Sequence, residues 1–150
     1  MKVIIQRVSE ASVTVDQKVV GKIAKGFLIL LGIGTEDSEA DADWLVQKTV
    51  GLRVFNDAEG LMNRSLAEVG GQVLVISQFT LMAATKKGNR PSYILAASPD
   101  QAIPLYEYFI QKLGQQLEEK VETGIFGADM KVRLLNDGPV TIPIDSKNRI

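Results

Sequence analysis

The sequence contains no cysteine and no histidine among its 150 residues. The absence of cysteine excludes disulfides, thiolate nucleophiles and cysteine-bound zinc or iron–sulfur sites. The absence of histidine removes the side chain that most often serves as a general base near neutral pH and as a metal ligand. A Ser-His-Asp triad is therefore excluded. Any catalysis must rely on carboxylates, hydroxyls, amines, backbone dipoles or groups that the substrate itself brings.

The chain also has almost no excess charge, because 17 Lys and Arg face 18 Asp and Glu for a net charge of −1. Such a chain has no general attraction for nucleic acid or anionic membranes. We expect RNA contact to be local, with no DNA and no membrane partner. The longest uncharged apolar run, residues 26–34, is about half of the ~20 residues that a membrane helix needs. Lys2 precedes any signal-peptide core, so we expect a cytoplasmic protein.

The pattern of apolar residues predicts one α+β domain over residues 1–150, mainly of antiparallel strands with two or three helices. Val13 and Val15 alternate with polar neighbours, as in a half-buried strand, and residues 16–18 offer a hairpin turn. Residues 27–31 are apolar throughout and lie between glycines, which is typical of a central strand buried on both faces. Further strands are expected at residues 53–55, 72–76, 130–135 and 140–144, with a turn over residues 136–139.

Two segments carry helix signals. Residues 35–38 offer a helix cap, and apolar residues follow at helical spacing from Ala42 to Thr49. A second helix begins near Ser98, which has capping-box spacing to Gln101. Pro104 is unfavourable inside a helix, so this helix either starts nearer position 100 or kinks.

The first candidate site is the end of the strand at residues 72–76, which runs into Ser77, Gln78, Phe79 and Thr80. Free backbone N–H groups and side chains meet solvent at strand ends. Strand alternation places Ser77 and Phe79 on one face and the other two on the opposite face. A hydroxyl nucleophile needs an activating base, and the motif has none, so covalent catalysis by Thr80 is not expected. The alternative is that the hydroxyls satisfy backbone groups where the strand stops.

The second candidate is Gly138-Pro139, within residues 136–141. An X–Pro bond is the peptide bond for which the cis form is accessible. A cis bond would turn two successive carbonyls to the same side, where they would suit an ammonium group. The alternative is a plain turn, and the sequence leaves both open.

Two further segments carry candidate binding residues. Lys86, Lys87 and Arg90 form a local basic loop that either binds phosphates or is simply solvated. Residues 123–130 contain two glycines around Phe126 and end at Met130, which fits either a pocket wall or a bulge. No acidic residues have the spacing of calcium or magnesium ligands, so we expect no metal and no cofactor.

The chain resembles the D-aminoacyl-tRNA deacylases over essentially its full length. The resemblance rests on residues 6–8, 11–15, 62–63, 77–81, 90–92, 127–130 and 136–141. It implies a barrel-like α+β domain and a homodimer with two active sites at the subunit interface. It further implies hydrolysis of the ester that joins a D-amino acid to tRNA, with the tRNA 2′-hydroxyl assisting and no cofactor.

The resemblance also implies roles for single residues. Gly138 and Pro139 resemble a Gly-cisPro element that enters the partner's pocket and obstructs L side chains, and Arg7 resembles the residue that holds it. Glycine has no side chain to obstruct, so glycyl-tRNA mischarged on other tRNAs is an expected substrate. Residues 77–80 are expected around the reacting carbonyl, with the N–H groups of Phe79 and Thr80 as oxyanion donors, and Phe126 and Met130 beside the substrate. Two alternatives are a non-catalytic dimeric module that binds RNA ends and an esterase for other small acyl esters.

Overall fold

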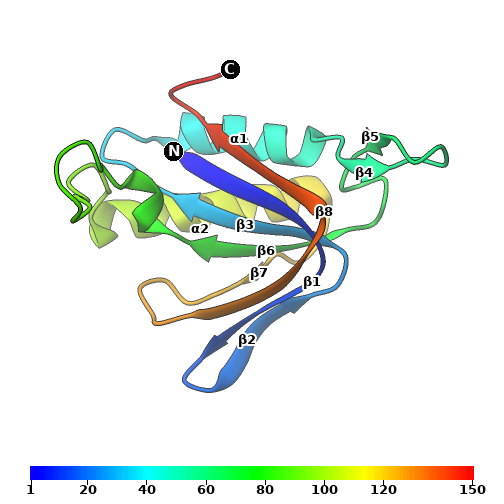
Figure 1. Cartoon of the computed structure of the whole chain (residues 1–150), viewed down its shortest axis with the longest axis horizontal. Coiled ribbons are helices and arrows are strands. Elements are labelled where there is room, and N and C mark those ends of the chain that lie inside the picture. Colours follow the sequence, from blue (N-terminus) through cyan, green and yellow to red (C-terminus); the bar gives the residue numbers. More distant parts are fainter.

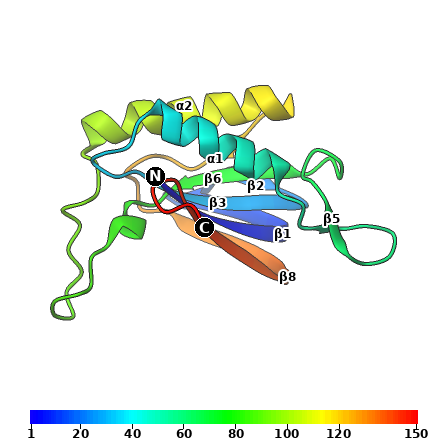
Figure 2. The ribbon, with the colours of Figure 1, turned by 90° about the horizontal axis from the view of Figure 1, so that it is seen from above.

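The computed structural model describes all 150 residues as a curved β-sheet with two α-helices on one side (Figures 1 and 2). The strands are β1 (Lys2–Val15), β2 (Lys18–Ile23), β3 (Gly26–Gly32), β4 (Phe55–Asn56), β5 (Met62–Arg64), β6 (Gln72–Ser77), β7 (Glu122–Thr123) and β8 (Lys131–Asp145). The helices are α1 (Glu39–Gly51), α2 (Pro99–Leu117) and the short 3₁₀-helix η1 (Phe79–Met82). Neither α-helix is long and apolar enough to cross a membrane.

The main sheet has the strand order β2-β1-β3-β6-β7, and β8 pairs with β1. The pairs that β1 makes with β2, β3 and β8 are antiparallel, whereas β3–β6 and β6–β7 are parallel. Because the 14-residue strand β1 pairs with three strands along its length, the sheet bends into a nearly closed, barrel-like shape. The predicted α+β class with mainly antiparallel strands is confirmed.

The core has two parts because the curved sheet buries both of its faces. The larger cluster lies between the sheet and the helices and includes Ile29 of β3 and Phe109 of α2. The smaller cluster lies inside the curve and includes Leu28 of β3 and Val13 of β1. Neighbouring residues of β3 therefore serve different clusters, as predicted for the apolar run at residues 27–31.

The local signals at two other positions are also confirmed. Asp16 and Gln17 have φ values of 47° and 66°, and they form the two-residue turn between β1 and β2. Ser38 is the N-cap of α1. Its backbone N–H donates to the Asp41 carboxylate at 2.9 Å, which satisfies a group at the helix start.

The prediction of two separate strands at the end of the chain is wrong. β8 is one strand of 15 residues, and both of its halves pair with β1. The register runs from Thr14 opposite Lys131 to Lys2 opposite Asp145, and it shifts on both sides of Val8. Residues 137–140 have no partner in this register, and Arg7 is the β1 residue opposite them. The turn-prone residues are therefore accommodated as a bulge, because β1 is long enough to pair with both halves.

Three other boundaries differ from the sequence predictions. β6 ends at Ser77 and the chain turns into η1, so strand alternation does not continue to Thr80. The strand predicted at residues 53–55 is β4, which begins at Phe55 and pairs with β5. α2 begins at Pro99 and contains Pro104, and the predicted capping box does not form because the Gln101 amide instead donates to the carbonyl of Thr35 at 2.7 Å.

Candidate active site

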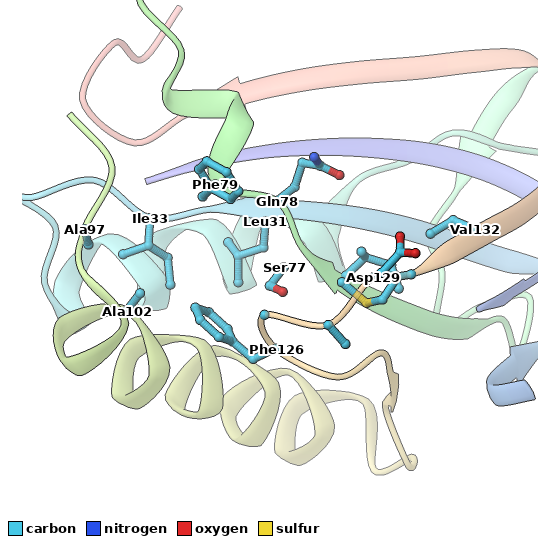
Figure 3. Close-up of a pocket in the computed structure, with 14 residues that line it drawn as sticks. Leu31, Ile33, Ser77, Gln78, Phe79, Ala97, Ala102, Phe126, Asp129 and Val132 are labelled. Carbon is cyan, nitrogen blue, oxygen red and sulfur yellow. The ribbon is translucent and has the colours of Figure 1, made fainter. Parts of the chain in front are cut away.

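A cavity of about 260 Å³ opens where β3 and β6 end, beside the start of α2 (Figure 3). Because β3 and β6 are parallel neighbours, their carboxyl ends meet at the same edge of the sheet. Ten of the 14 residues that line the cavity are hydrophobic. The lining residues are Leu31, Ile33, Ile76, Ser77, Gln78, Phe79, Ala97, Ala102, Phe126, Gly127, Ala128, Asp129, Met130 and Val132.

Three of the four residues predicted at the strand end line this cavity, namely Ser77, Gln78 and Phe79. The backbone N–H of Gln78 donates to the carbonyl of Leu31 at 2.7 Å, which fixes the point where the chain leaves the sheet. Thr80 does not line the cavity; its hydroxyl accepts a hydrogen bond from the Gln78 side-chain amide. Phe79 and Thr80 begin η1, so their N–H groups have no acceptor within that helix.

The segment before β8 forms the opposite wall, which selects the pocket-wall alternative for residues 123–130. Phe126 faces the cavity from the side of α2 (Figure 3), where its ring packs edge-to-face on Tyr106 with centroids 5.6 Å apart. Burial raises the pKa of Tyr106 to about 12, so this phenol is neutral at physiological pH. A Cβ at Gly124 would collide with Sδ of Met130, so a glycine at this position lets Met130 pack against the chain.

Asp129 is the one ionisable residue that lines the cavity. Its carboxylate forms an ion pair with Lys131 at 3.0 Å, and its side chain is 84% exposed. The cavity therefore contains no buried charge. Its polar groups are those of Ser77, Gln78 and the backbone, together with this paired carboxylate.

Gly138 and Pro139 lie away from this cavity, in the exposed bulge of β8, and the peptide bond between them is cis. We call Asp137, Gly138 and Pro139 the β8 corner. Arg7 holds this corner from beneath. Its side chain is buried, and Nε donates to the carbonyl of Asp137 at 2.9 Å while Nη1 donates to the carbonyl of Val54.

Two more observations show how firmly the β8 corner is held. The Asn136 amide donates to the carbonyl of Val140 at 3.0 Å, across the base of the corner. Gly138 has a φ of +133°, and a Cβ there would lie 2.9 Å from Nη2 of Arg7. Both the backbone conformation and the space therefore require glycine at this position.

Lys86, Lys87 and Arg90 are exposed and form no ion pair. Their loop projects from the body of the protein between η1 and α2 (Figure 2). The backbone bonds between Ala84 and Ser92, at 2.8 and 3.0 Å, close its base. The three cations thus lie at the tip of an arm that begins just after the cavity-lining motif.

The sequence analysis missed six cavity residues: Leu31, Ile33, Ile76, Ala97, Ala102 and Val132. Leu31 and Ile33 lie at the end of the apolar run that predicted β3, next to the strand that carries Ser77. Their role becomes apparent once β3 and β6 are known to be parallel neighbours. Ala97 and Ala102 have small apolar side chains that leave room for the cavity, and such residues give no chemical signal in a sequence.

Known proteins are similar to this chain over nearly its whole length. A model of the family described as D-Tyr-tRNA(Tyr) deacylase matches residues 4–145. The D-aminoacyl-tRNA deacylases of Flavobacterium psychrophilum and Phocaeicola vulgatus are 60% and 62% identical to this chain, and each alignment covers 99% of both chains.

Solved structures give the same result for the fold. A protein named c-Myc DNA Unwinding Element Binding Protein matches with a TM-score of 0.91 and 39% identity, over 97% of this chain and 98% of that chain. A probable eukaryotic D-amino acid tRNA deacylase matches with a TM-score of 0.79 over 95% of this chain and 98% of that chain. The identity in that second match is 16%, so it supports the fold alone.

Proposed function

The chain belongs to the D-Tyr-tRNA(Tyr) deacylase family, and on that premise we propose that it hydrolyses the ester joining a D-amino acid to the 3′ end of a tRNA. The resemblance drawn from the sequence motifs is thereby confirmed. The observation that carries the proposal is that the motif at residues 77–79 and the segment at residues 126–130 line one cavity. Non-catalytic RNA binding and cleavage of unrelated esters remain outcomes of the test below.

In this proposal the ester carbonyl lies beside the start of η1. The backbone N–H groups of Phe79 and Thr80 stabilise the oxyanion that develops when water attacks the carbonyl carbon. This assignment is supported by the position of both residues at the start of η1, where their N–H groups have no acceptor within the helix. The hydrogen bond from Gln78 to Thr80 keeps the first turn in place. Each preorganised donor of this kind lowers the activation free energy by about 2.7–4 kcal/mol.

The proton transfers are assigned to the substrate. Asp129, the only ionisable group that lines the cavity, is exposed and paired with Lys131. Histidine and cysteine are absent from the chain. We therefore assign the orientation and activation of water to the 2′-hydroxyl of the terminal adenosine. Water adds to the carbonyl carbon, the bond to the 3′ oxygen breaks, and the proton from water ends on that oxygen.

Chiral selection is assigned to the β8 corner of a second copy of the chain. The corner is exposed, does not line its own cavity and is anchored by the buried Arg7. In a homodimer it would enter the neighbouring cavity beside the α-carbon of the amino acid. A rigid backbone there collides with an L side chain and leaves a D side chain free. Glycine has no side chain to collide, so glycyl-tRNA is also a proposed substrate.

Contacts to the RNA are assigned to Lys86, Lys87 and Arg90, which are exposed and free of ion pairs. Three phosphate contacts on a single strand predict a logarithmic salt slope of about −2. In this proposal the protein contacts the tRNA only at its acceptor end.

The decisive experiment measures hydrolysis of D-tyrosyl-tRNA and L-tyrosyl-tRNA by the purified protein. We expect rapid loss of the D ester and persistence of the L ester. A second D-tyrosyl-tRNA, ending in 2′-deoxyadenosine, should resist hydrolysis. Binding without cleavage would indicate the RNA-end-binding alternative. Equal cleavage of the deoxy substrate would contradict the assigned role of the 2′-hydroxyl.

A further inference from the structure

An exposed pair of aromatic rings lies at the mouth of the cavity. The rings of Phe79 and Tyr93 pack edge-to-face, with centroids 5.0 Å apart and planes at 70°. Phe79 is 56% exposed and Tyr93 is 39% exposed, and neither belongs to a core cluster. Only Phe79 of the two lines the cavity. Packing in the core therefore does not explain why Tyr93 is placed there.

The backbone around Tyr93 is fixed on both sides. On one side, Ser92 pairs with Ala84 at the base of the cationic arm. On the other side, the carbonyl of Tyr93 accepts from the N–H of Ala96 at 2.9 Å, and the N–H of Ala97 donates to Ile33 at 2.9 Å. The Tyr93 ring is therefore held between the cavity and the arm.

The segment that carries this ring has charge of only one sign. Residues 78–99 contain Lys86, Lys87 and Arg90 and no Asp or Glu, which gives this segment a charge of +3 in a chain of net charge −1. Exposed aromatic rings beside cations are the combination that binds single-stranded nucleic acid, because bases stack on the rings and phosphates meet the cations. This combination favours an RNA occupant over a protein partner.

We propose that Tyr93 is a stacking platform for the base that precedes the terminal adenosine at the unpaired 3′ end of the substrate. The terminal ester enters the cavity beside Phe79, the preceding base lies on Tyr93, and its phosphates approach the cationic arm. This inference rests on the proposed function. It adds a residue that recognises the RNA outside the pocket in which the ester is cleaved.

The test compares D-tyrosyl-adenosine with a D-tyrosyl ester of the trinucleotide CCA. The ring-free variants are Tyr93→Leu and Tyr93→Gln, and Tyr93→Phe and Tyr93→Trp retain a ring. Loss of one stacked base predicts a KM for the trinucleotide about 5- to 150-fold higher in the ring-free variants, with kcat nearly unchanged. The same variants should cleave D-tyrosyl-adenosine as the wild type does. The ring-retaining variants should match the wild type on both substrates.

Ile94→Ala is the matched control, because Ile94 is the next residue, is 76% exposed and has no ring. It should leave the KM of both substrates unchanged. An equal loss on both substrates, no loss on either, or an equal effect of Ile94→Ala would overturn the proposal. A change of oligomeric state in sedimentation of Tyr93→Leu would also overturn it, because the patch would then be a contact between copies. A wild type that cleaves neither ester would instead refute the proposed function.

Discussion

Arg7→Met should strongly lower the preference for D over L substrates, while it lowers the free energy of unfolding only modestly. Arg7 is 7% exposed, and its guanidinium donates to the carbonyls of Val54 and Asp137. Val54 is buried, so its carbonyl is left without a hydrogen-bond donor in this variant. The free energy of unfolding should fall by about 1–3 kcal/mol as a result. The carbonyl of Asp137 lies at the exposed corner, where water replaces the lost donor at little cost. The β8 corner, however, loses the contact that fixes its position.

The assay is the ratio of kcat/KM for D-tyrosyl-tRNA to that for L-tyrosyl-tRNA, measured beside urea unfolding. We expect the ratio to fall at least tenfold in Arg7→Met, because an obstruction works only while it is rigid. Arg7→Lys should recover little, because a single ammonium does not reproduce the planar fork that bonds both carbonyls.

Two variants serve as controls for this prediction. Arg53→Met removes an exposed arginine that donates to the carbonyl of Asn63 at 2.7 Å, and it should change stability by less than about 0.5 kcal/mol. Asp137→Asn removes an ion pair of 3.6 Å whose carboxylate is 51% exposed, and it should leave the ratio unchanged. An unchanged ratio in Arg7→Met, with the expected loss of stability, would refute the role of the corner in selection.

Three further predictions concern other parts of the molecule. Thr80→Ala keeps the backbone N–H that we assign to the oxyanion, so the single-turnover rate should fall less than about tenfold; complete loss with intact binding would point to a nucleophile. Burial opposes the ionisation of Asp41, but hydrogen bonds from Lys147, Ser146 and Ser38 outweigh it, so the pKa of Asp41 is lowered from 3.8. Because the pKa of Asp41 is lower in the folded than in the unfolded protein, its stabilisation is present above about pH 4 and is lost on further acidification. The free energy of unfolding in urea, measured between pH 2 and 7, should fall towards low pH in the wild type and fall less in Asp41→Asn. Combined replacement of Lys86, Lys87 and Arg90 by alanine should bring the salt slope of kcat/KM from about −2 towards zero, and an unchanged slope would place the phosphate contacts elsewhere.

Local patterns were sufficient for elements whose burial is continuous or strictly periodic. The apolar run at residues 27–31 predicted β3, and the spacing from Ala42 to Thr49 predicted α1. The end of β8 could not be predicted in the same way. Residues 136–139 carry strong turn signals, but pairing with β1 on both sides decides their structure, and pairing is not a local property. Likewise, η1 follows Ser77 and packs on Gly32, where a Cβ would lie 2.8 Å from the Cβ of Leu81. This contact joins residues far apart in the sequence and so is not part of the local pattern.

The site was only partly accessible from the sequence for a related reason. The motif at residues 77–80 and the segment at residues 126–130 were identified as candidates, but nothing in the sequence gives the distance between them. Their meeting in one cavity follows from the parallel pairing of β3 with β6 and from the path that leads into β8. Gln78 illustrates the limit of alternation. Alternation separates it from Ser77 and Phe79, but all three line the cavity because β6 ends at Ser77 and the chain turns into η1.

The continuity of β8 ties the length of its corner to the interior of the protein. Val140, Ile142 and Ile144 follow the corner and pack against the larger core cluster. One residue inserted beside Pro139 has to be absorbed within the unpaired bulge, because a shift of residues 141–145 by one position against β1 would turn each of these side chains to the opposite face. A longer corner would therefore change the geometry that Arg7 and Asn136 hold, while the pairing of residues 141–145 with β1 stays as it is.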